Sequence, residues 1–269
     1  MTHWICVTCG TQFAESEAEP AECPICTDAR QYVPEEGQRW TTPEELSAER
    51  SNEIRDEGEL TGVGVDPWFA IGQRALLVDS VLWDCVHLVD ESAAEEIERR
   101  GGLRGVAISH PHYYTGMVEW AHRFDCPVYL HAADERWIMR PDPLIELWEG
   151  DVKELGNGLT LVRCGGHFAG GTVLHWAGGA EGRGVLLSGD IVQVIPDRSH
   201  VSFMYSYPNL IPLPAESVRG IARSLEPYPF ETLYGAWWGR VVKGDAKGIV
   251  ERSAERYVRA VGGELPEGA

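Results

Sequence analysis

The sequence predicts a mixed α/β sandwich preceded by a small cysteine-rich segment. Apolar runs of strand length alternate along the chain with segments whose hydrophobic residues recur at helical spacing. Such alternation favours sheets covered by helices, and no repeat of about 20–50 residues points to a solenoid. Four of the seven cysteines lie within residues 1–33, which sets that segment apart from the rest of the chain.

Composition divides the chain into three expected parts. Residues 1–33 are turn-rich and form the expected cysteine segment. Residues 34–60 are acidic and poor in large apolar side chains, so they are expected to be a linker with one helical turn. That turn would start at Thr42-Pro43-Glu44, which offers an N-cap, a proline at the first helical position and then acids. Residues 61–269 are expected to form the main domain.

Turn residues and hydrophobic spacing locate the individual elements. Ser92 is the expected N-cap of the first long helix, and Gly101 lies just past its end. The expected helices are Ser92–Arg100, Thr115–Phe124, Val218–Leu225 and Ala246–Val261. The expected strands are Trp68–Ile71, Arg74–Val78, Gly105–Ile108, Pro127–Leu130, Leu159–Arg163, Val173–Trp176 and Val185–Leu187.

Length and charge exclude several classes of function. A chain of 269 residues can form one core, or one core with a small appendage. The formal charge of -19, from 42 acidic and 23 basic residues, argues against nucleic acid or an anionic membrane as a partner. There is neither a basic, apolar leader nor an apolar run long enough to span a bilayer. We therefore expect a cytoplasmic protein with reduced thiols.

The N-terminal cysteines are spaced as metal ligands. Cys6 and Cys9 form one C-x-x-C turn, Cys23 and Cys26 form a second, and 13 residues separate the two. Two such turns supply a tetrahedral sulfur cage, whereas the alternative is a disulfide pair or unliganded thiols. The turns resemble a rubredoxin-like or zinc-ribbon knuckle. That resemblance implies a closed site for zinc or iron, and zinc is favoured because Thr27 stands where rubredoxins usually carry glycine.

Three histidines and one aspartate follow expected strands. His110 and His112 are separated by one residue after an apolar strand, and His167 lies in a glycine-rich loop. Asp190 follows the strand Val185–Leu187 through Ser-Gly. A single histidine is more often a hydrogen-bonded core or surface group. Three histidines with one carboxylate, each at a strand end, form a plausible set of Zn²⁺ ligands.

The order of these residues resembles the metallo-β-lactamase superfamily. An H-x-H motif, a G-H-x-x-G motif about 55 residues later and a strand-terminal G-D occur in the order of its glyoxalase-like branch, over residues 62–245. The resemblance implies a four-layer αββα sandwich over residues 61–269. It also implies that Asp84 does not bind the metal itself but orients the residues that do.

The chain departs from that superfamily at the ligands of a second ion. In the usual H-x-H-x-D-H signature, Tyr114 stands in the place of the aspartate and Thr115 in the place of the third histidine. The segment 234–239, where a last histidine is usual, contains none. We therefore expect a single zinc ion at the remaining ligands, which are His110, His112, His167 and Asp190.

The expected activity is hydrolysis of a small ester, thioester, lactone or amide. Zinc with an open position lowers the pKa of water from 15.7 to about 7. Asp190 would act as a base or as a fourth ligand. Tyr113 or Tyr114 would donate a hydrogen bond to an oxyanion, although packing against the nearby tryptophans is an alternative role for both.

Two other classes of function remain open at this point. The changed signature positions favour a non-catalytic binding or regulatory protein, in which the fold has lost its activity. The rubredoxin-like cysteines favour a redox protein, but the carboxylates of diiron relatives are absent. The expected partner is a small-molecule substrate. A homo-oligomer is left open.

Overall fold

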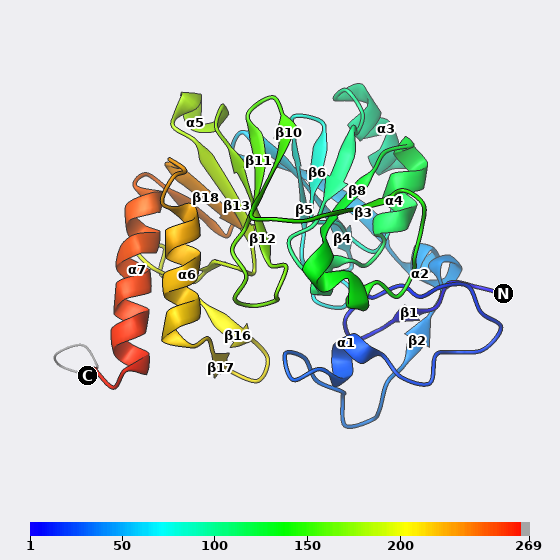
Figure 1. Cartoon of the computed structure of the whole chain (residues 1–269). Helices are drawn as coiled ribbons and strands as arrows, with labels where there is room; N and C mark the ends of the chain where they lie inside the picture. Colours follow the sequence, from blue (N-terminus) through cyan, green and yellow to red (C-terminus); the bar gives the residue numbers. More distant parts are fainter. Residues whose placement is uncertain (265–269) are drawn as a thin grey trace. The chain divides into compact units, whose positions relative to one another are not determined.

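The computed structural model describes residues 1–264, and the chain divides into two compact units at residues 148 and 149 (Figure 1). Each unit contains one large β-sheet with helices packed against it. Among the described residues, no helix is both long enough and apolar enough to cross a membrane.

The first unit contains a seven-stranded sheet. Its strands, in spatial order, are β3 (Ser51–Glu57), β4 (Leu60–Asp66), β5 (Ala75–Val78), β6 (Val81–Trp83), β7 (Gly105–Ala107), β8 (Val128–His131) and β9 (Ile145–Trp148). Neighbours from β3 to β6 are antiparallel, and those from β6 to β9 are parallel. The parallel crossovers contain α3 (Glu91–Arg99) and α4 (Met117–Phe124). Because crossover helices cover a parallel sheet, β6 and β7 are apolar and fully buried.

The cysteine segment belongs to this first unit. Its two short strands, β1 (Ile5–Cys6) and β2 (Trp40–Thr41), pair with each other, and α1 (Pro24–Thr27) lies between them in sequence. The next helix, α2 (Pro43–Glu49), starts at the expected N-cap, where Thr42 and Glu45 form a capping box. Ile5 shares a hydrophobic cluster with Leu46, Phe69 and Leu88. The segment is therefore part of the first unit's core packing.

The second unit contains a six-stranded sheet. Its strands, in spatial order, are β10 (Val152–Gly156), β11 (Leu159–Arg163), β12 (Thr172–Trp176), β13 (Val185–Gly189), β18 (Thr232–Gly235) and β19 (Val241–Lys243). Only the pairing of β13 with β18 is parallel, and α6 (Ala215–Leu225) lies in that crossover. Two short hairpins, β14–β15 (Gln193–Val194 and Val201–Ser202) and β16–β17 (Met204–Ser206 and Ile211–Pro212), precede α6. The short turn α5 (Gly179–Gly182) joins β12 to β13.

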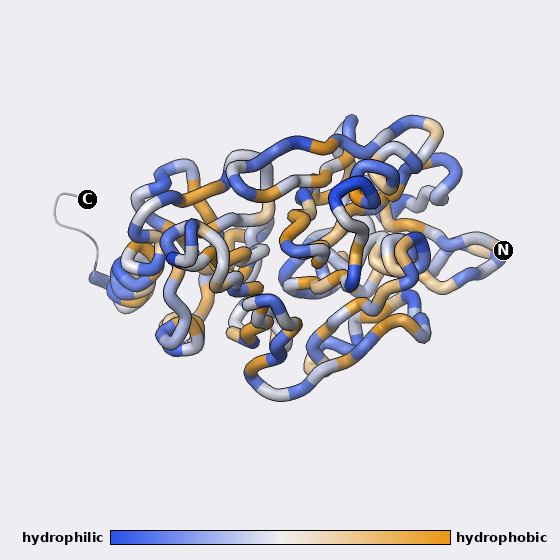
Figure 2. Tube along the Cα trace, turned by 90° about the horizontal axis from the view of Figure 1, so that it is seen from above, coloured by the Kyte–Doolittle hydropathy of each residue, from blue (hydrophilic) through white to orange (hydrophobic). Residues whose placement is uncertain are grey.

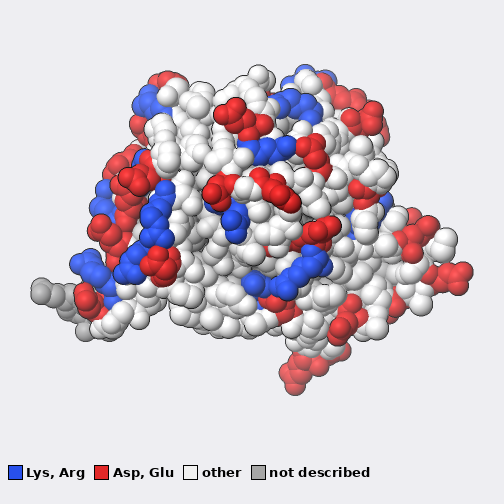
Figure 3. All heavy atoms as spheres, in the orientation of Figure 1, with Lys and Arg blue, Asp and Glu red and all other residues white. Residues whose placement is uncertain are grey.

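Helices α6 and α7 (Ala246–Val261) pack against each other through Val218, Ile221, Val250 and Ala254. Hydrophobic and hydrophilic residues are interspersed along the Cα trace of the chain (Figure 2). Acidic and basic side chains are interspersed over the surface of these helices (Figure 3). Glu216 and Arg223 of α6 form one ion pair there. This pattern is that of two amphipathic helices covering one sheet.

Most expected elements form, but the strand expected at residues 68–71 and the expected cap of the first long helix are wrong. Residues 68–71 form a turn instead of a strand, with Trp68 71% exposed. The N-cap of α3 is Asp90, because its carboxylate accepts a hydrogen bond from the Ala93 backbone N–H at 2.8 Å. Ser92 donates its hydroxyl to the same carboxylate.

The structure also differs from the sequence interpretation in the acidic segment 34–60. Its last part forms β3, which pairs along its whole length with β4. This strand is at the edge of the sheet and is largely polar, with Ser51, Arg55 and Asp56 exposed. Charged residues are common on edge strands, because they discourage pairing with other chains. Because of the same charged residues, the segment lacks the apolar alternation from which a strand is predicted.

The turn before β13 allows a matched test of close packing. Gly182 and Gly184 both have φ near +85° (+84° and +88°). A Cβ on Gly184 would lie 2.0 Å from the Pro229 carbonyl oxygen, whereas one on Gly182 meets nothing within 4 Å. We expect Gly182→Ala to lower the free energy of unfolding by about 1 kcal/mol and Gly184→Ala by about 3 kcal/mol or more. Urea unfolding measures both, and equal losses would contradict this packing.

Candidate metal centres

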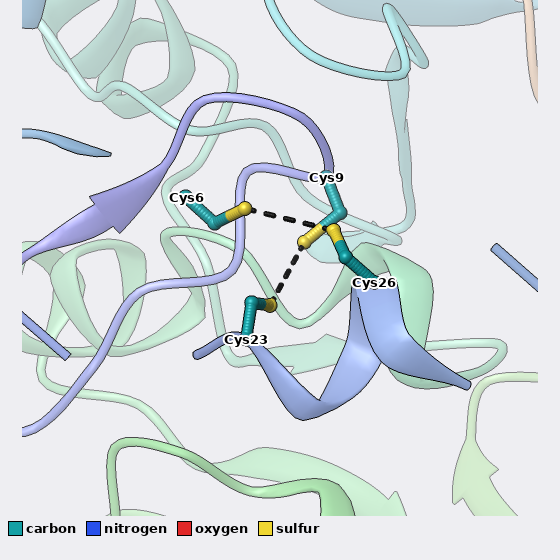
Figure 4. A group of neighbouring side chains, drawn as sticks. All are labelled: Cys6, Cys9, Cys23 and Cys26. Carbon is teal, nitrogen blue, oxygen red and sulfur yellow. Dashed lines mark hydrogen bonds between the residues drawn. The ribbon is translucent and has the colours of Figure 1, made fainter. Parts of the chain in front are cut away.

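The four N-terminal cysteines converge in the first unit (Figure 4). Cys6 ends β1, Cys9 lies in the turn that follows, Cys23 caps α1 and Cys26 lies within it. Gly10 has φ +79° and donates its backbone N–H to the Cys6 carbonyl, which closes the first turn. All four side chains are buried. Each C-x-x-C pair therefore contributes both of its sulfurs to one point.

The sulfur geometry fits a tetrahedral ion. All four Sγ atoms lie within 4.8 Å of one another, and the Sγ distances from Cys6 to Cys26 and from Cys9 to Cys23 are both 3.6 Å. A tetrahedron with metal–sulfur bonds of about 2.3 Å has edges of about 3.8 Å. A disulfide needs about 2.05 Å, and all four cysteines are free. The cluster can thus bind a metal ion, as its spacing indicated.

Burial makes an ion at this point chemically reasonable. It raises the pKa of the Cys9 thiol well above its ordinary value, because a thiolate is poorly solvated there. A bound divalent cation reverses this preference and holds the sulfurs as thiolates.

His110 and His112 lie together at the carboxyl end of β7. The strand ends at Ala107, His110 precedes the short 3₁₀ helix η1 (Pro111–Tyr113), and His112 lies within it. Both imidazoles are buried, and their ring centroids are 5.1 Å apart. Nitrogens of the two rings lie within 4.8 Å of each other. The turn after the strand therefore bends both imidazoles toward one region.

A hydrogen-bonded chain orients His110. The Asp84 carboxylate accepts hydrogen bonds from the Ser109 backbone N–H at 2.8 Å and from its hydroxyl at 2.7 Å. The Ser109 oxygen lies 2.8 Å from His110 Nδ1 and can accept its proton. Burial raises the pKa of Asp84 to about 7, and the hydrogen bonds from Ser109 oppose that shift. With a proton on Nδ1, Nε2 is the nitrogen that can bind a metal.

Both tyrosines of this turn are buried. The Tyr113 ring lies 4.4 Å from that of His110, measured between centroids. Burial raises the pKa of Tyr114 well above its ordinary value, and the charge of Asp134 acts in the same direction. The Tyr114 hydroxyl therefore keeps its proton at neutral pH, so it can donate a hydrogen bond but cannot act as a base.

Thr115 stands where the superfamily signature has a histidine, and it contacts the protein interior. Its hydroxyl lies 3.2 Å from the Cys85 sulfur, which also donates to the Tyr113 carbonyl at 3.2 Å. Cys85 and Cys126 are buried and Cys164 is partly buried, which agrees with a packing role for these three thiols.

His167 and Asp190 form a second pair, in the second unit. His167 lies in the loop between β11 and β12, and its Nδ1 donates to the Met204 carbonyl at 3.1 Å. Asp190 follows β13 directly. A nitrogen of His167 and a carboxylate oxygen of Asp190 lie within 4.8 Å of each other. This unit therefore also presents two ligand-capable groups at strand ends.

Tyr207 supports both members of this second pair. Its hydroxyl donates to the Asp190 backbone carbonyl at 2.7 Å, and its ring centroid lies 5.6 Å from that of His167. Sequence reasoning did not single out Tyr207. The only signal was its place in the apolar, proline-rich segment 203–214.

His87 is a buried histidine beside the turn that carries Cys9, and no sequence motif pointed to a role for it. Neither of its ring nitrogens has a hydrogen-bond partner among the described residues. Its ring packs edge-on against Phe69, and a Cβ on Gly10 would lie 2.0 Å from His87 Nε2. Burial lowers the pKa of His87 to about 3, and the charge of Arg50 acts in the same direction.

This shift predicts acid sensitivity. The folded-state pKa of His87 lies below the unfolded value of 6.5, so the unfolded chain binds the proton first as the pH falls. The stabilisation is full above pH 6.5 and is lost between pH 6.5 and about 3, up to about 5 kcal/mol. We expect the free energy of unfolding of His87→Leu, measured by urea titration at several pH values in this range, to fall less steeply with decreasing pH than that of the wild type. Parallel stability curves for the two proteins would contradict the shift.

Comparison with known proteins finds one relative of similar length. No family model matches the chain. The uncharacterized protein YmaE of Bacillus subtilis (strain 168) is 47% identical over 272 residues, an alignment that covers 98% of this chain and 99% of YmaE.

Solved structures share the architecture at low identity. The metallo-β-lactamase DIM-1 aligns with a TM-score of 0.57 and 14% identity, over 78% of this chain and 98% of its own. A B3 metallo-β-lactamase with an active-site glutamic acid aligns with a TM-score of 0.51 and 16% identity, over 81% of this chain and 90% of its own. The chain therefore has the metallo-β-lactamase fold, and the fold class expected from the sequence is confirmed.

Proposed function

Since the chain belongs to the same family as the YmaE protein of Bacillus subtilis and has the metallo-β-lactamase fold, we propose that it is a metal-dependent hydrolase with a single catalytic zinc ion. The proposed ligands are the buried groups that follow strand ends, namely His110, His112, His167 and Asp190. The observation that carries the proposal is the presence, in each unit, of a buried pair of such groups with ligand atoms within 4.8 Å.

The hydrogen bonds of two histidines support metal binding. The Nδ1 atom of His110 lies at hydrogen-bond distance from the Ser109 hydroxyl oxygen. The Nδ1 atom of His167 lies at hydrogen-bond distance from the Met204 carbonyl oxygen. A histidine that binds a metal through one nitrogen usually donates its other N–H in this way. Both imidazoles are thus held in the tautomer that offers Nε2 as a ligand.

The proposed site holds one ion, because the ligands that a second would need are absent. Tyr114 cannot replace a carboxylate ligand while it keeps its proton, and Thr115 is hydrogen-bonded to Cys85. Segment 234–239 contains no histidine. This part of the proposal separates the chain from two-metal hydrolases.

Zinc in a site of this kind acidifies a water molecule and polarises a substrate carbonyl. The chain's own residues supply the remaining roles. Asp190 accepts the proton of the attacking water or completes the ligand set. The Tyr114 hydroxyl, which stays protonated, donates a hydrogen bond to the oxyanion that forms, and Tyr113 is the second candidate for that role. Asp84 holds His110 through Ser109.

The proposed substrate is a small ester, thioester, lactone or amide. The formal charge of -19 disfavours a polyanionic substrate such as nucleic acid. Hydrolysis of a small substrate also fits the glyoxalase-like branch of the superfamily, to which we propose that residues 62–245 belong.

Metal removal tests the proposal. The full chain, freed of metal by a chelator and reconstituted with zinc, would be assayed against one representative of each of the four substrate classes. We expect hydrolysis of at least one class, its loss after stripping, and its return with zinc while circular dichroism shows a folded protein. Hydrolysis that survives complete stripping would contradict a metal-dependent mechanism.

The cysteine site supports a second candidate, a redox protein. We propose that residues 1–33 form a rubredoxin-like or zinc-ribbon knuckle, and four thiolates accept iron as well as zinc. The peroxy diiron species of the chemotaxis sensor ODP aligns with a TM-score of 0.50 and 14% identity, over 76% of this chain and 94% of its own. A coloured, iron-containing purified protein would favour this candidate. A colourless protein with zinc at the cysteines would end it.

A further inference from the structure

We propose that the cysteine cluster is a positioning element for the histidine pair His110 and His112, so that loss of the ion at the cysteines weakens ion binding at the histidines. The four residues Asp84–His87, here called the bridging segment, make the connection. The proposal rests on the proposed function only in taking the two histidines as ligands.

The cysteine end of the connection is the contact of Gly10 with His87. Gly10 directly follows Cys9 and has a positive φ. A Cβ at this position would lie 2.0 Å from His87 Nε2 and 2.1 Å from its Cδ2, so the ring rests against the turn that carries Cys9. The ring makes no hydrogen bond in the described residues, and it also packs edge-on against Phe69. Packing alone therefore fixes it, and movement of the turn would be transmitted to it.

The first half of the bridging segment contacts the turn that carries the histidines. Asp84 binds Ser109 through two hydrogen bonds, and Ser109 in turn contacts His110. Cys85 donates its thiol to the Tyr113 carbonyl. Both contacts lie within one residue of a proposed ligand. A shift of the bridging segment therefore changes the position of the imidazoles.

The second half contacts the start of α4. The Val86 carbonyl accepts the indole N–H of Trp120 at 3.0 Å. Gly116 lies so close that a Cβ on it would be 2.9 Å from the Val86 carbonyl oxygen and 3.0 Å from that of His87. Every residue of the bridging segment thus contacts the segment 109–120. Close packing of this kind transmits displacement because it leaves little room for repacking.

A second connection runs from the cysteine turn to α4. The Gln12 side-chain amide donates to Glu119 at 3.3 Å, and Arg140 donates to both Gln12 at 2.6 Å and Glu119 at 2.5 Å. Nearby, the Ala14 N–H donates to the Met139 carbonyl at 3.0 Å. The helix that follows the histidine pair is therefore held to the cysteine segment independently of His87.

A glycine pair within the cysteine segment gives a matched test. Gly10 (φ +79°) and Gly37 (φ +88°) carry the same backbone strain for alanine, but a Cβ on Gly37 meets nothing within 4 Å. The full chain would be loaded with zinc, and zinc affinity at the histidines would be measured by chelator competition. We expect Gly10→Ala to weaken it about 10-fold, Gly37→Ala to leave it unchanged, and His87→Ala added to Gly10→Ala to restore it. Equal affinity in Gly10→Ala and Gly37→Ala would overturn the proposal.

Hydrogen exchange separates this inference from the proposed function. We expect Gly10→Ala to speed amide exchange over residues 109–116 and to leave residues 159–176 unchanged. If the wild-type chain binds an ion only at the cysteines, the proposed function fails, and the exchange rates alone decide the positioning role. If Gly10→Ala does not fold, Gln12→Ala and His87→Ala replace it, and unchanged exchange and affinity in both would overturn the proposal.

Discussion

His112→Ala is expected to abolish hydrolysis and to remove the ion held by the histidines. His112 is buried within the turn after β7, beside His110. Alanine removes one of the proposed imidazole ligands, and a water molecule binds zinc less tightly than an imidazole does. Without the ion, water returns from a pKa of about 7 toward 15.7, and we expect kcat/KM to fall by about 10³-fold or more. The assay is zinc binding by calorimetry together with turnover of the substrate class identified by screening.

The matched control is His122→Ala, on the exposed side of α4. His122 contacts Asp142 at 2.8 Å and lies outside both candidate centres. Zinc binding and turnover are expected to stay at the wild-type level in this variant. If His112→Ala kept both its zinc and its turnover, the assignment of the histidines as ligands would be wrong.

Cys23→Ser is expected to cause the largest loss of stability. Cys23 caps α1 and is one of four buried sulfurs around one point. Structural zinc contributes about 10–16 kcal/mol of apparent binding free energy in zinc-finger peptides. The small hydrophobic cluster around Ile5 and Leu46 stabilises this segment by less than a bound ion would. We expect a loss of several kcal/mol in the first unit, measured by thermal unfolding together with zinc content.

The comparison variant for this experiment is Cys164→Ser. That thiol is partly buried in the second unit and belongs to neither candidate centre. It should keep its zinc and change the midpoint of unfolding only slightly. An unchanged midpoint and zinc content in Cys23→Ser would show that the cysteines do not hold a stabilising ion.

Features set by short-range chemistry could be predicted from the sequence. The C-x-x-C turns bring sulfurs together because two residues between cysteines fix the geometry locally, and Gly10 supplies the positive φ. The α/β class followed from the alternation of strand-length apolar runs with segments of helical spacing, and the order of His110, His112, His167 and Asp190 supplied the resemblance to the metallo-β-lactamase superfamily. Each of these residues is buried near the end of a strand. Buried, apolar strands such as β13 were equally visible.

Features set by long-range contacts could not be predicted. The strand β3 is polar because it is an edge, so it lacks the apolar alternation of a half-buried strand. Tyr207 supports Asp190 through a backbone carbonyl, which no side-chain pattern reveals. His87 meets Gly10 only after the chain has folded across more than seventy residues. Ser92 was expected to cap α3, but Asp90 lies nearer the helix start and is the stronger acceptor.

Counting ions in the wild-type chain tests the central claim most directly. Elemental analysis of the zinc-saturated, desalted full-length protein would give the number of ions per chain. The account predicts two, one at the four cysteines and one at the three histidines with Asp190. A single ion per chain would contradict the proposed catalytic site. Three would contradict its single-metal character.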